Sequence, residues 1–279
     1  MKQRAKKTSV ILSLLTISVI AICTNPRPLF AIAHSQEIFQ INTDSSSSID
    51  RKTAVKNIRA FAKLYGYVKY FHPSDEASAI DWERFAIYGT EHVKKSASQD
   101  DLKNKLKDLF LPIAPTVQIY LADEQPPTPA AILTPEDTTG LKLVAWQHEG
   151  FGFGDYSYYQ SIRLNRPAED PADPLFEKQP KAGEVVERLI GMGLAAQIPL
   201  ALYSKDGQTL RPEGVPSTQQ LKERLQSVPI NTLTGADEAL RYADVVIAWN
   251  VFQHFYPYFD VVNVHWENIL SEALHKASQ

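Results

Sequence analysis

Ser204 and Lys205 are adjacent in this 279-residue chain and are its first candidates for chemistry. A lysine that burial keeps neutral can act as the general base for a serine nucleophile within hydrogen-bond reach. Here the pair lies in the turn-forming stretch YSKDGQ, where a lysine is expected to be solvated and charged. We therefore expect no Ser/Lys dyad at this position.

Histidines could act as general bases or metal ligands. A Ser-His-Asp triad assembles in space, so spacing alone does not exclude one, but the chain has no Gly-x-Ser-x-Gly elbow. His148-Glu149 lacks the second histidine of a His-Glu-x-x-His helix, and the glycines after it would break a helix. We expect no catalytic residue, no metal site and no cofactor. The histidines weighed are His72, His148, His254 and His265.

An aromatic stretch, GFGFGDYSYY at residues 150–159, is the segment most suggestive of ligand binding. Together with Trp146, its side chains Tyr156 and Tyr158 could form a stacking platform for a sugar or a peptide. The alternative, which we favour, is a glycine-loosened hairpin whose aromatic side chains fill the core of a sheet. The sequence leaves both interpretations open.

One pattern occurs twice, as YVKYFHPSDEASAIDWERF at residues 67–85 and VFQHFYPYFDVVNVHWENI at residues 251–269. The two copies align without a gap, which pairs the identities Phe71/Phe255, Pro73/Pro257, Trp82/Trp266 and Glu83/Glu267. Polar groups of the first copy are lost in the second, where His72, Asp75 and Asp81 become Tyr256, Phe259 and His265. Because the apolar pattern and the proline persist without the acid–base groups, we interpret the motif as a structural joint.

The joint predicts its own helix boundaries. Pro73 should end one helix, because the residue before a proline is pushed out of the α region. Asp81 should cap the next helix. His72 is expected to pack or to form a capping hydrogen bond, and Phe71 and Trp82 are expected to be core anchors.

The remaining elements predict an α+β protein. Amphipathic spacing predicts helices over residues 51–115 and again over 236–279. Residues 116–210 contain short apolar runs, separated by Pro- and Gly-rich segments, that favour an antiparallel, sandwich-like β domain. These runs are TVQIYLA, LKLVAWQ, YSYYQSIRL and MGLAAQIPLALY. Residues 211–235 are polar and predict a linker, so the β domain is inserted between two helix–Pro–helix segments. The sequence leaves open whether these segments touch.

The N-terminal segment, residues 1–33, has the features of a signal peptide. It combines a basic start, an apolar run from Ser9 to Cys23, and a small-x-small site ending at Ala33. A retained anchor is the alternative, but the run is short for a membrane span of about 20 residues. A Ser-rich flexible linker follows over residues 34–50. We expect an exported protein, periplasmic or secreted, cleaved near Ala33 and not stably inserted in a membrane.

Removal of this segment changes the charge balance. Five of the chain's 29 basic residues lie in it, which leaves 24 basic against 32 acidic residues and a net charge of −8. Such a charge argues against nucleic acid or anionic lipid as a partner. The one cysteine also lies in this segment, so we expect no disulfide in the mature protein.

Several segments together resemble a known family. LYGYVKYFHPSDEASAIDWERFAIYG resembles the N-terminal region of exported bacterial serine peptidases related to the tail-specific, C-terminal-processing peptidases. YQSIRLNRP, GLAAQIPLALYSKDGQTL and RYADVVIAWNVFQHFYPYFDVVNVHWENILSEAL are similar to later segments of those proteins, in the same order. The motif residues are Tyr65, Gly66, Tyr67, Tyr70, Phe71, His72, Pro73, Asp81, Trp82, Phe255, Pro257 and Trp266.

The resemblance implies a catalytic domain after the second helical segment, with a serine nucleophile and a lysine base. No position of this chain matches those residues, so none is carried over. We expect a non-catalytic accessory region that positions the catalytic domain or its polypeptide substrate, and that has no peptidase activity alone. The alternatives are a free-standing glycan- or peptide-binding module and a truncated product without independent function.

Overall fold

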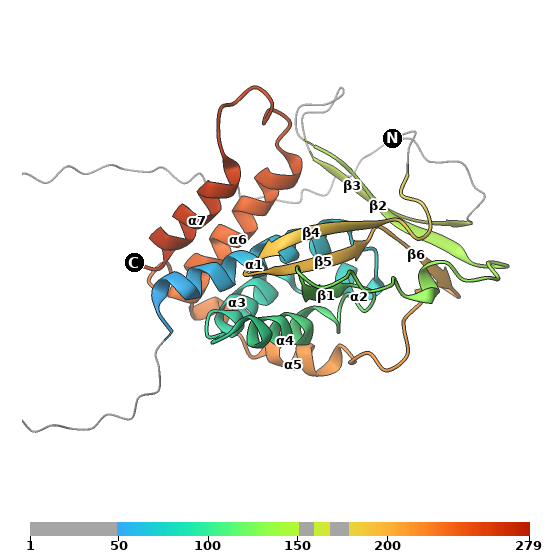
Figure 1. The fold of residues 1–279 in the computed structure, drawn as a ribbon, viewed down its shortest axis with the longest axis horizontal. Coiled ribbons are helices and arrows are strands. Elements are labelled where there is room, and N and C mark those ends of the chain that lie inside the picture. Colours follow the sequence, from blue (N-terminus) through green and yellow to red (C-terminus); the bar gives the residue numbers. More distant parts are fainter. Residues whose placement is uncertain (1–48, 151–158, 168–178) are drawn as a thin grey trace, which may run out of the picture. The chain divides into compact units, whose positions relative to one another are not determined.

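The computed structural model describes residues 49–150, 159–167 and 179–279 (Figure 1). Helices come first, strands follow, and helices return at the C-terminal end. The sheets are antiparallel. The prediction of an α+β fold with an antiparallel β part between helical segments is therefore confirmed.

The two long helices, α1 (Arg51–Phe71) and α6 (Glu238–Phe255), end in the same way. After α1, His72 is extended with φ −80° and ψ 118°, and after α6, Tyr256 has φ −80° and ψ 116°. Each of these residues precedes a proline, which excludes the α conformation and ends the helix. Both copies of the repeat thus carry the same helix stop. None of the helices among the described residues is long and apolar enough to cross a membrane.

Shorter helices follow each stop. After the first come α2 (Asp75–Ala79), α3 (Trp82–Val93) and α4 (Gln99–Phe110), and after the second comes α7 (Trp266–Ala277). The Asp81 side chain accepts a hydrogen bond from the Arg84 amide at 3.0 Å, which is the predicted cap. The residue at the matching position before α7, His265, makes no such bond. The repeat therefore preserves the helix start and not its cap.

We expect Asp81→Ala to lower the free energy of unfolding by about 1 kcal/mol, because the Arg84 amide loses its acceptor. The exposed ion pair between Asp81 and Arg84 should add little to this loss. Chemical denaturation measures the effect, and Asp123→Ala, in an exposed turn, is the control. Equal losses in the two variants would contradict the capping role.

The two helix–Pro–helix units pack against each other. Helix α1 contacts α6, while α3 of the first unit packs on α6 and α7 of the second unit packs on α1. The hydroxyl of Tyr65 donates to the carbonyl of Trp82 at 3.1 Å, and the indole of Trp249 donates to the carbonyl of Trp266 at 3.0 Å. Both donors and both acceptors occupy matching positions when the two copies of the repeat are aligned. The units are thus a pseudo-symmetric pair.

Helices α1 and α6 touch at matching positions. Gly66 of α1 faces Asn250 of α6, which occupies the same place in the repeat. The Asn250 side-chain amide donates to the carbonyls of Ala62 at 2.8 Å and Val246 at 2.9 Å. These two residues are repeat mates, by which we mean that they occupy matching positions in the two copies of the repeat. A Cβ atom on Gly66 would lie 1.9 Å from Asn250 Oδ1. The close approach of the two helices therefore requires glycine at position 66.

Two small sheets lie beside the helices (Figure 1). One has the order β1-β5-β4 and the other β3-β2-β6-β7. The strands are β1 (Gln118–Leu121), β2 (Lys142–Glu149), β3 (Gln160–Pro167), β4 (Val185–Gly191), β5 (Leu194–Pro199), β6 (Ala201–Lys205) and β7 (Gln208–Thr209). Strand β5 is buried along its whole length, and α1 packs on β4 and β5. The β1-β5-β4 sheet and the helices thus share one core.

That core is built around aromatic side chains of the first unit. Phe61, Tyr65, Phe85 and Phe110 are fully buried, with ring centroids 5.2 to 6.4 Å apart in the contacting pairs. Trp82 packs against their edge. Residues 211–235, expected to be a linker, contain the helix α5 (Gln219–Gln226) and the 3₁₀ turn η2 (Ile230–Thr232). Both leucines of α5 are buried. A further 3₁₀ turn, η1 (Ala131–Leu133), lies between β1 and β2.

Candidate functional site

The C-terminal ends of α1 and α6 meet the β2–β3 hairpin in a group of histidine and aromatic rings. We call it the histidine–aromatic cluster, and its members are Tyr70, Phe71, His148, Tyr159, His254 and Phe255. Phe71 lies 5.5 Å from the His148 ring and 5.1 Å from the His254 ring. Phe71 is half-buried and packs in this cluster. The sequence predicts it as an anchor of the main core instead.

Both histidines of the cluster are held neutral. Burial lowers the pKa of His254 to about 4, with a smaller contribution from His148 nearby. Burial also lowers the pKa of His148, although the hydrogen bond to the Tyr70 carbonyl opposes this. The His148 Nδ1 atom lies 2.6 Å from the Tyr159 hydroxyl. Among the described residues, these rings contact other rings, a phenol and a carbonyl, and no serine hydroxyl bonds to either of them.

A serine does contact a histidine at the first joint, which we define as residues 72–81. His72 Nδ1 lies 3.0 Å from Ser74 Oγ, and Nε2 lies 2.8 Å from Thr116 Oγ1. The Ser74 hydroxyl donates to the Ile113 carbonyl at 2.5 Å, so its proton is committed. His72 and Ser74 are both fully buried, out of reach of any substrate. This contact is therefore structural, as predicted for His72.

Other polar groups lock the first joint to the sheet. Arg163 of β3 donates to the Pro73 carbonyl at 2.7 and 3.0 Å and pairs with Asp75 at 2.5 Å. The Thr209 amide donates to the other Asp75 oxygen at 2.6 Å. Burial acts to raise the pKa of Asp75, but the hydrogen bonds from Thr209 and Arg163 outweigh it and lower the pKa. Asp75 is thus an ionised structural group.

The Ser204-Lys205 pair does not form a dyad. Successive residues of a strand point to opposite faces, and β6 contains both residues. Ser204 is buried and its hydroxyl donates to Asn165 Oδ1 at 2.9 Å, whereas Lys205 is exposed. An exposed lysine on the opposite face of the strand cannot reach the buried serine to act as its base.

No group of three or more His, Cys, Asp or Glu side chains within the described part of the chain is placed to hold a metal ion. His254 lies in the histidine–aromatic cluster and His265 lies exposed before α7. His148-Glu149 is on strand β2 and not on a helix.

The proposed stacking platform is described only in part. Trp146 on β2 is half-buried and stacks on His148, with centroids 5.6 Å apart and an interplanar angle of 14°. One face of the Trp146 ring is thus occupied by the protein itself. Tyr156 and Tyr158 lie outside the described residues.

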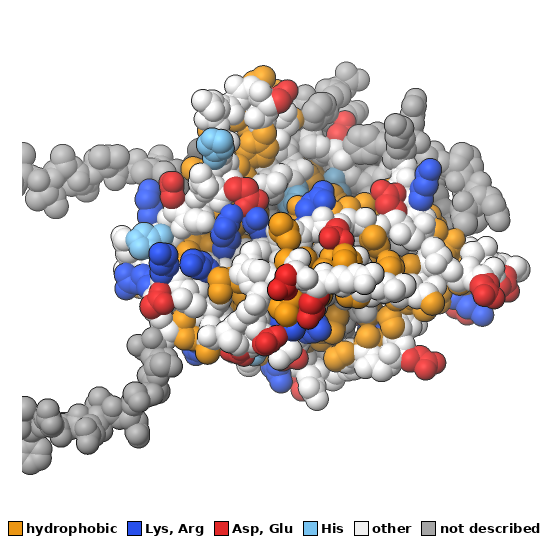
Figure 2. Space-filling view, in the orientation of Figure 1, with side chains coloured by type: hydrophobic (Ala, Val, Ile, Leu, Met, Phe, Trp, Pro, Cys, Tyr) orange, Lys and Arg blue, Asp and Glu red, His pale blue; other side chains and the backbone are white. Residues whose placement is uncertain are grey.

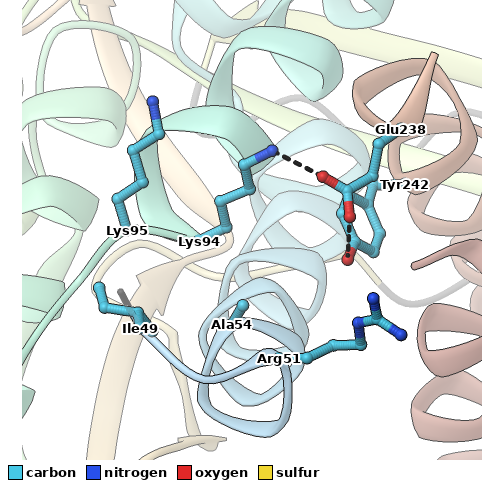
Figure 3. A pocket seen from close by; sticks show the side chains of 7 residues that line it. All are labelled: Ile49, Arg51, Ala54, Lys94, Lys95, Glu238 and Tyr242. Atoms are coloured by element: carbon cyan, nitrogen blue, oxygen red, sulfur yellow. Dashed lines mark hydrogen bonds and ion pairs between the residues drawn. The ribbon is translucent and has the colours of Figure 1, made fainter. Parts of the chain in front are cut away.

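Two of the cavities among the described residues lie at opposite ends of the paired helices. One of about 320 Å³ lies beside the histidine–aromatic cluster, between His148, Gly150 and Pro257. The other, of about 530 Å³, lies at the N-terminal ends of α1 and α6 (Figure 3). There Lys94 pairs with Glu238 at 2.9 Å, and Tyr242 donates to the same carboxylate at 3.1 Å. The carboxylate of Glu238 is therefore already paired with Lys94 and Tyr242, and it is not available as a general base in this cavity.

The second joint, which we define as residues 256–265, differs from the first in its exposure. Hydrophobic side chains reach the surface around the α6–α7 connection (Figure 2). The exposed fractions are 49% for Phe252, 49% for Tyr258, 73% for Val261 and 46% for Val264. Their repeat mates are all buried, namely Val68, Ser74, Ala77 and Ile80. The same positions are thus covered in one unit and uncovered in the other.

This surface was missed by reasoning from the sequence alone, although the repeat contained a signal. Aligning the two copies places Tyr, Val and Val of the second joint opposite Ser, Ala and Ile of the first. The alignment could not show which of the two joints would be buried by other segments of the chain. Arg163 and Thr116, which cover the first joint, come from segments far along the sequence.

Comparison of the chain with protein-family models, with curated proteins and with solved structures found no match.

Proposed function

We propose that this chain is the non-catalytic accessory region of an exported serine-peptidase-like protein, and that it positions a polypeptide. The observation that carries the proposal is the uncovered second joint, where Tyr258, Val261 and Val264, beside Phe252 of α6, present apolar surface. Their counterparts in the first unit are buried by the chain itself. Contiguous apolar side chains at a surface are typical of protein-contact sites.

The chemistry of the described residues supports a role without catalysis. His72 and Ser74 are buried in the first joint, His148 and His254 are neutral ring-packing groups, and Ser204 is bonded to Asn165. The serine-peptidase part of the proposal rests on the resemblance of residues 64–89, and export rests on residues 1–33 with cleavage near Ala33. We place the protein in the periplasm or outside the cell.

A glycan- or peptide-binding module built on the aromatic stretch is the weaker candidate. Trp146 stacks on His148, which leaves only one face for a ligand. The acidic balance of the chain also disfavours nucleic acid as a partner of either function.

The test is to incubate the full chain with fluorescein-labelled β-casein, an unfolded polypeptide. We expect the labelled casein to bind, seen as a rise in fluorescence anisotropy, and to remain uncleaved on a denaturing gel. Binding is expected because an unfolded chain can offer apolar segments to the second joint. An unlabelled folded protein of similar size is the control competitor and should not displace the casein.

Two outcomes would contradict the proposal. One is cleavage of casein that disappears when a single serine or histidine of this chain is replaced. The other is no rise in anisotropy at any protein concentration. The DNA after codon 279 tests the family assignment separately, since a peptidase domain encoded there, in frame or shifted, would support it.

A further inference from the structure

The segment that covers the first joint indicates what covers the second. Residues 112–117, with the sequence PIAPTV, follow α4 and are all buried. Their polar contacts to the joint come from the Ile113 carbonyl, which accepts from Ser74, and from the Thr116 hydroxyl, which lies 2.8 Å from His72. The first joint is therefore contacted by a buried, uncharged and proline-containing stretch of polypeptide that folds in turns.

We propose that the second joint binds an apolar, proline-containing polypeptide segment of the same kind, supplied by the polypeptide that this region positions. This inference rests on the proposed function and specifies its ligand. The backbone at the two joints begins alike, since His72 and Tyr256 share a φ of −80° and have nearly the same ψ. The helix that follows each joint starts at the repeat mates Trp82 and Trp266. The two joints thus start and end alike, although α2 of the first joint has no helical counterpart in the second.

Aromatic rings make the second surface suited to this ligand. Tyr256 lies 5.1 Å from Phe259 and 6.1 Å from Phe252, and Trp266 lies 5.5 Å from Phe252. These rings are linked into one partly exposed cluster. Prolines and branched aliphatic side chains pack well on such rings, and the fixed φ of each proline lowers the entropic cost of ordering the segment.

Charge indicates which segments are excluded. From Tyr242 to His275 the chain contains no lysine or arginine, while Asp260 is exposed at the second joint. The Asp75 of the first joint, which pairs with Arg163, is replaced by Phe259. The second joint therefore carries no lysine or arginine of its own for an acidic ligand, and an acidic segment should be repelled. An uncharged apolar segment matches it best.

The experiment titrates the full chain with a capped peptide that has the sequence of residues 111–118, LPIAPTVQ. The readout is the indole N–H signal of Trp266 in a ¹H–¹⁵N spectrum, identified by its loss in Trp266→Phe. We expect a saturable shift with a dissociation constant below about 1 mM. The same peptide carrying Ile113→Asp and Val117→Asp should produce no saturable shift.

Surface variants locate the contact. Tyr258→Ser with Val261→Ser should weaken peptide binding about tenfold, because both side chains lose apolar contact area. Ile162→Ser on β3, which also removes an exposed apolar side chain, is the matched control and should leave binding unchanged. No saturable shift, or equal binding by the double variant and the wild-type chain, would overturn the inference. If casein binds while the peptide does not compete with it, this inference fails and the proposed function stands. If neither ligand binds, both fail.

Discussion

Gly66→Ala should lower the free energy of unfolding by about 2–4 kcal/mol, as the difference between a small gain and two larger costs. Alanine is the better helix former by about 1 kcal/mol, so propensity alone would stabilise α1. Against this, the new methyl group would lie 1.9 Å from Asn250 Oδ1 and 2.5 Å from His254 Nε2, and both side chains must move. Overpacking of this kind costs about 1–3 kcal/mol. Displacing the Asn250 amide from the Ala62 and Val246 carbonyls leaves a buried donor unpaired, at a further cost of about 1–3 kcal/mol.

Chemical denaturation of the purified variants measures this effect. Gly235→Ala is the matched control, because a Cβ atom there meets no other atom within 4 Å. A second comparison uses Asn250→Ala, alone and together with Gly66→Ala. We expect the double variant to be more stable than the sum of the single losses predicts, because removing the Asn250 side chain makes room for the methyl group. Wild-type stability in Gly66→Ala, or strict additivity, would contradict the close approach of α1 and α6 at this point.

The contrast between helix ends and helix contacts explains what the sequence could reveal. Pro73, Pro257 and Asp81 act on their own neighbours, so the helix stops and the α3 cap were predictable from local chemistry. The contact between Gly66 and Asn250 joins residues at opposite ends of the folded chain. Both residues occupy the same place in the repeat, but nothing in the repeat states that its two copies face each other. A glycine in a helix permits another helix to approach closely, but the sequence does not identify the residue that it contacts.

The strands show the same division. Three of the predicted runs coincide with strands. The first, TVQIYLA, contains β1; LKLVAWQ contains most of β2; and MGLAAQIPLALY contains β5 and most of β6. These strands were predictable because alternating or continuous apolar residues are typical of buried strands. Strand β4 was missed. It carries Glu187 and Arg188 at exposed positions of an edge strand, so its pattern of side chains does not mark a buried surface. The role of Arg163 in holding the first joint also depends on strand placement and had no local signal.

The second large effect is a loss of stability in mild acid. Burial lowers the pKa of His72 to about 3, with a smaller contribution from Arg163, and the pKa of His254 to about 4. In the unfolded chain these rings have an ordinary pKa near 6.5. As the pH falls below that value, the unfolded state binds protons that the folded state cannot bind. The stabilisation is therefore complete above about pH 6.5 and is lost progressively toward the folded pKa values.

We expect His72 and His254 each to lower the free energy of unfolding by about 2 kcal/mol between pH 7 and pH 5, or about 4 kcal/mol together, and the lowered pKa of His148 adds to this loss. This is a large share of the roughly 5–15 kcal/mol that stabilises a typical domain. The lowered pKa of Asp75 also contributes to acid lability, but only below the ordinary range of an aspartate near 4, so the interval from pH 7 to 5 isolates the histidines. Chemical denaturation at a series of pH values gives the slope.

Two variants and a control separate the causes of this slope. Because the Ser74 hydroxyl donates to Ile113, the neutral His72 ring donates from Nδ1 to Ser74 and accepts from Thr116 at Nε2. Protonation of Nε2 would reverse the second contact, because the Thr116 hydroxyl would then accept, and would place a charge inside a fully buried site. His72→Gln keeps polar atoms without a titrating ring, so it should be less stable at pH 7 but should have a smaller slope than the wild-type chain, as should His254→Gln. His275→Gln, at an exposed position on α7, should leave the slope unchanged. A wild-type slope in both His72→Gln and His254→Gln would show that other groups take up the protons.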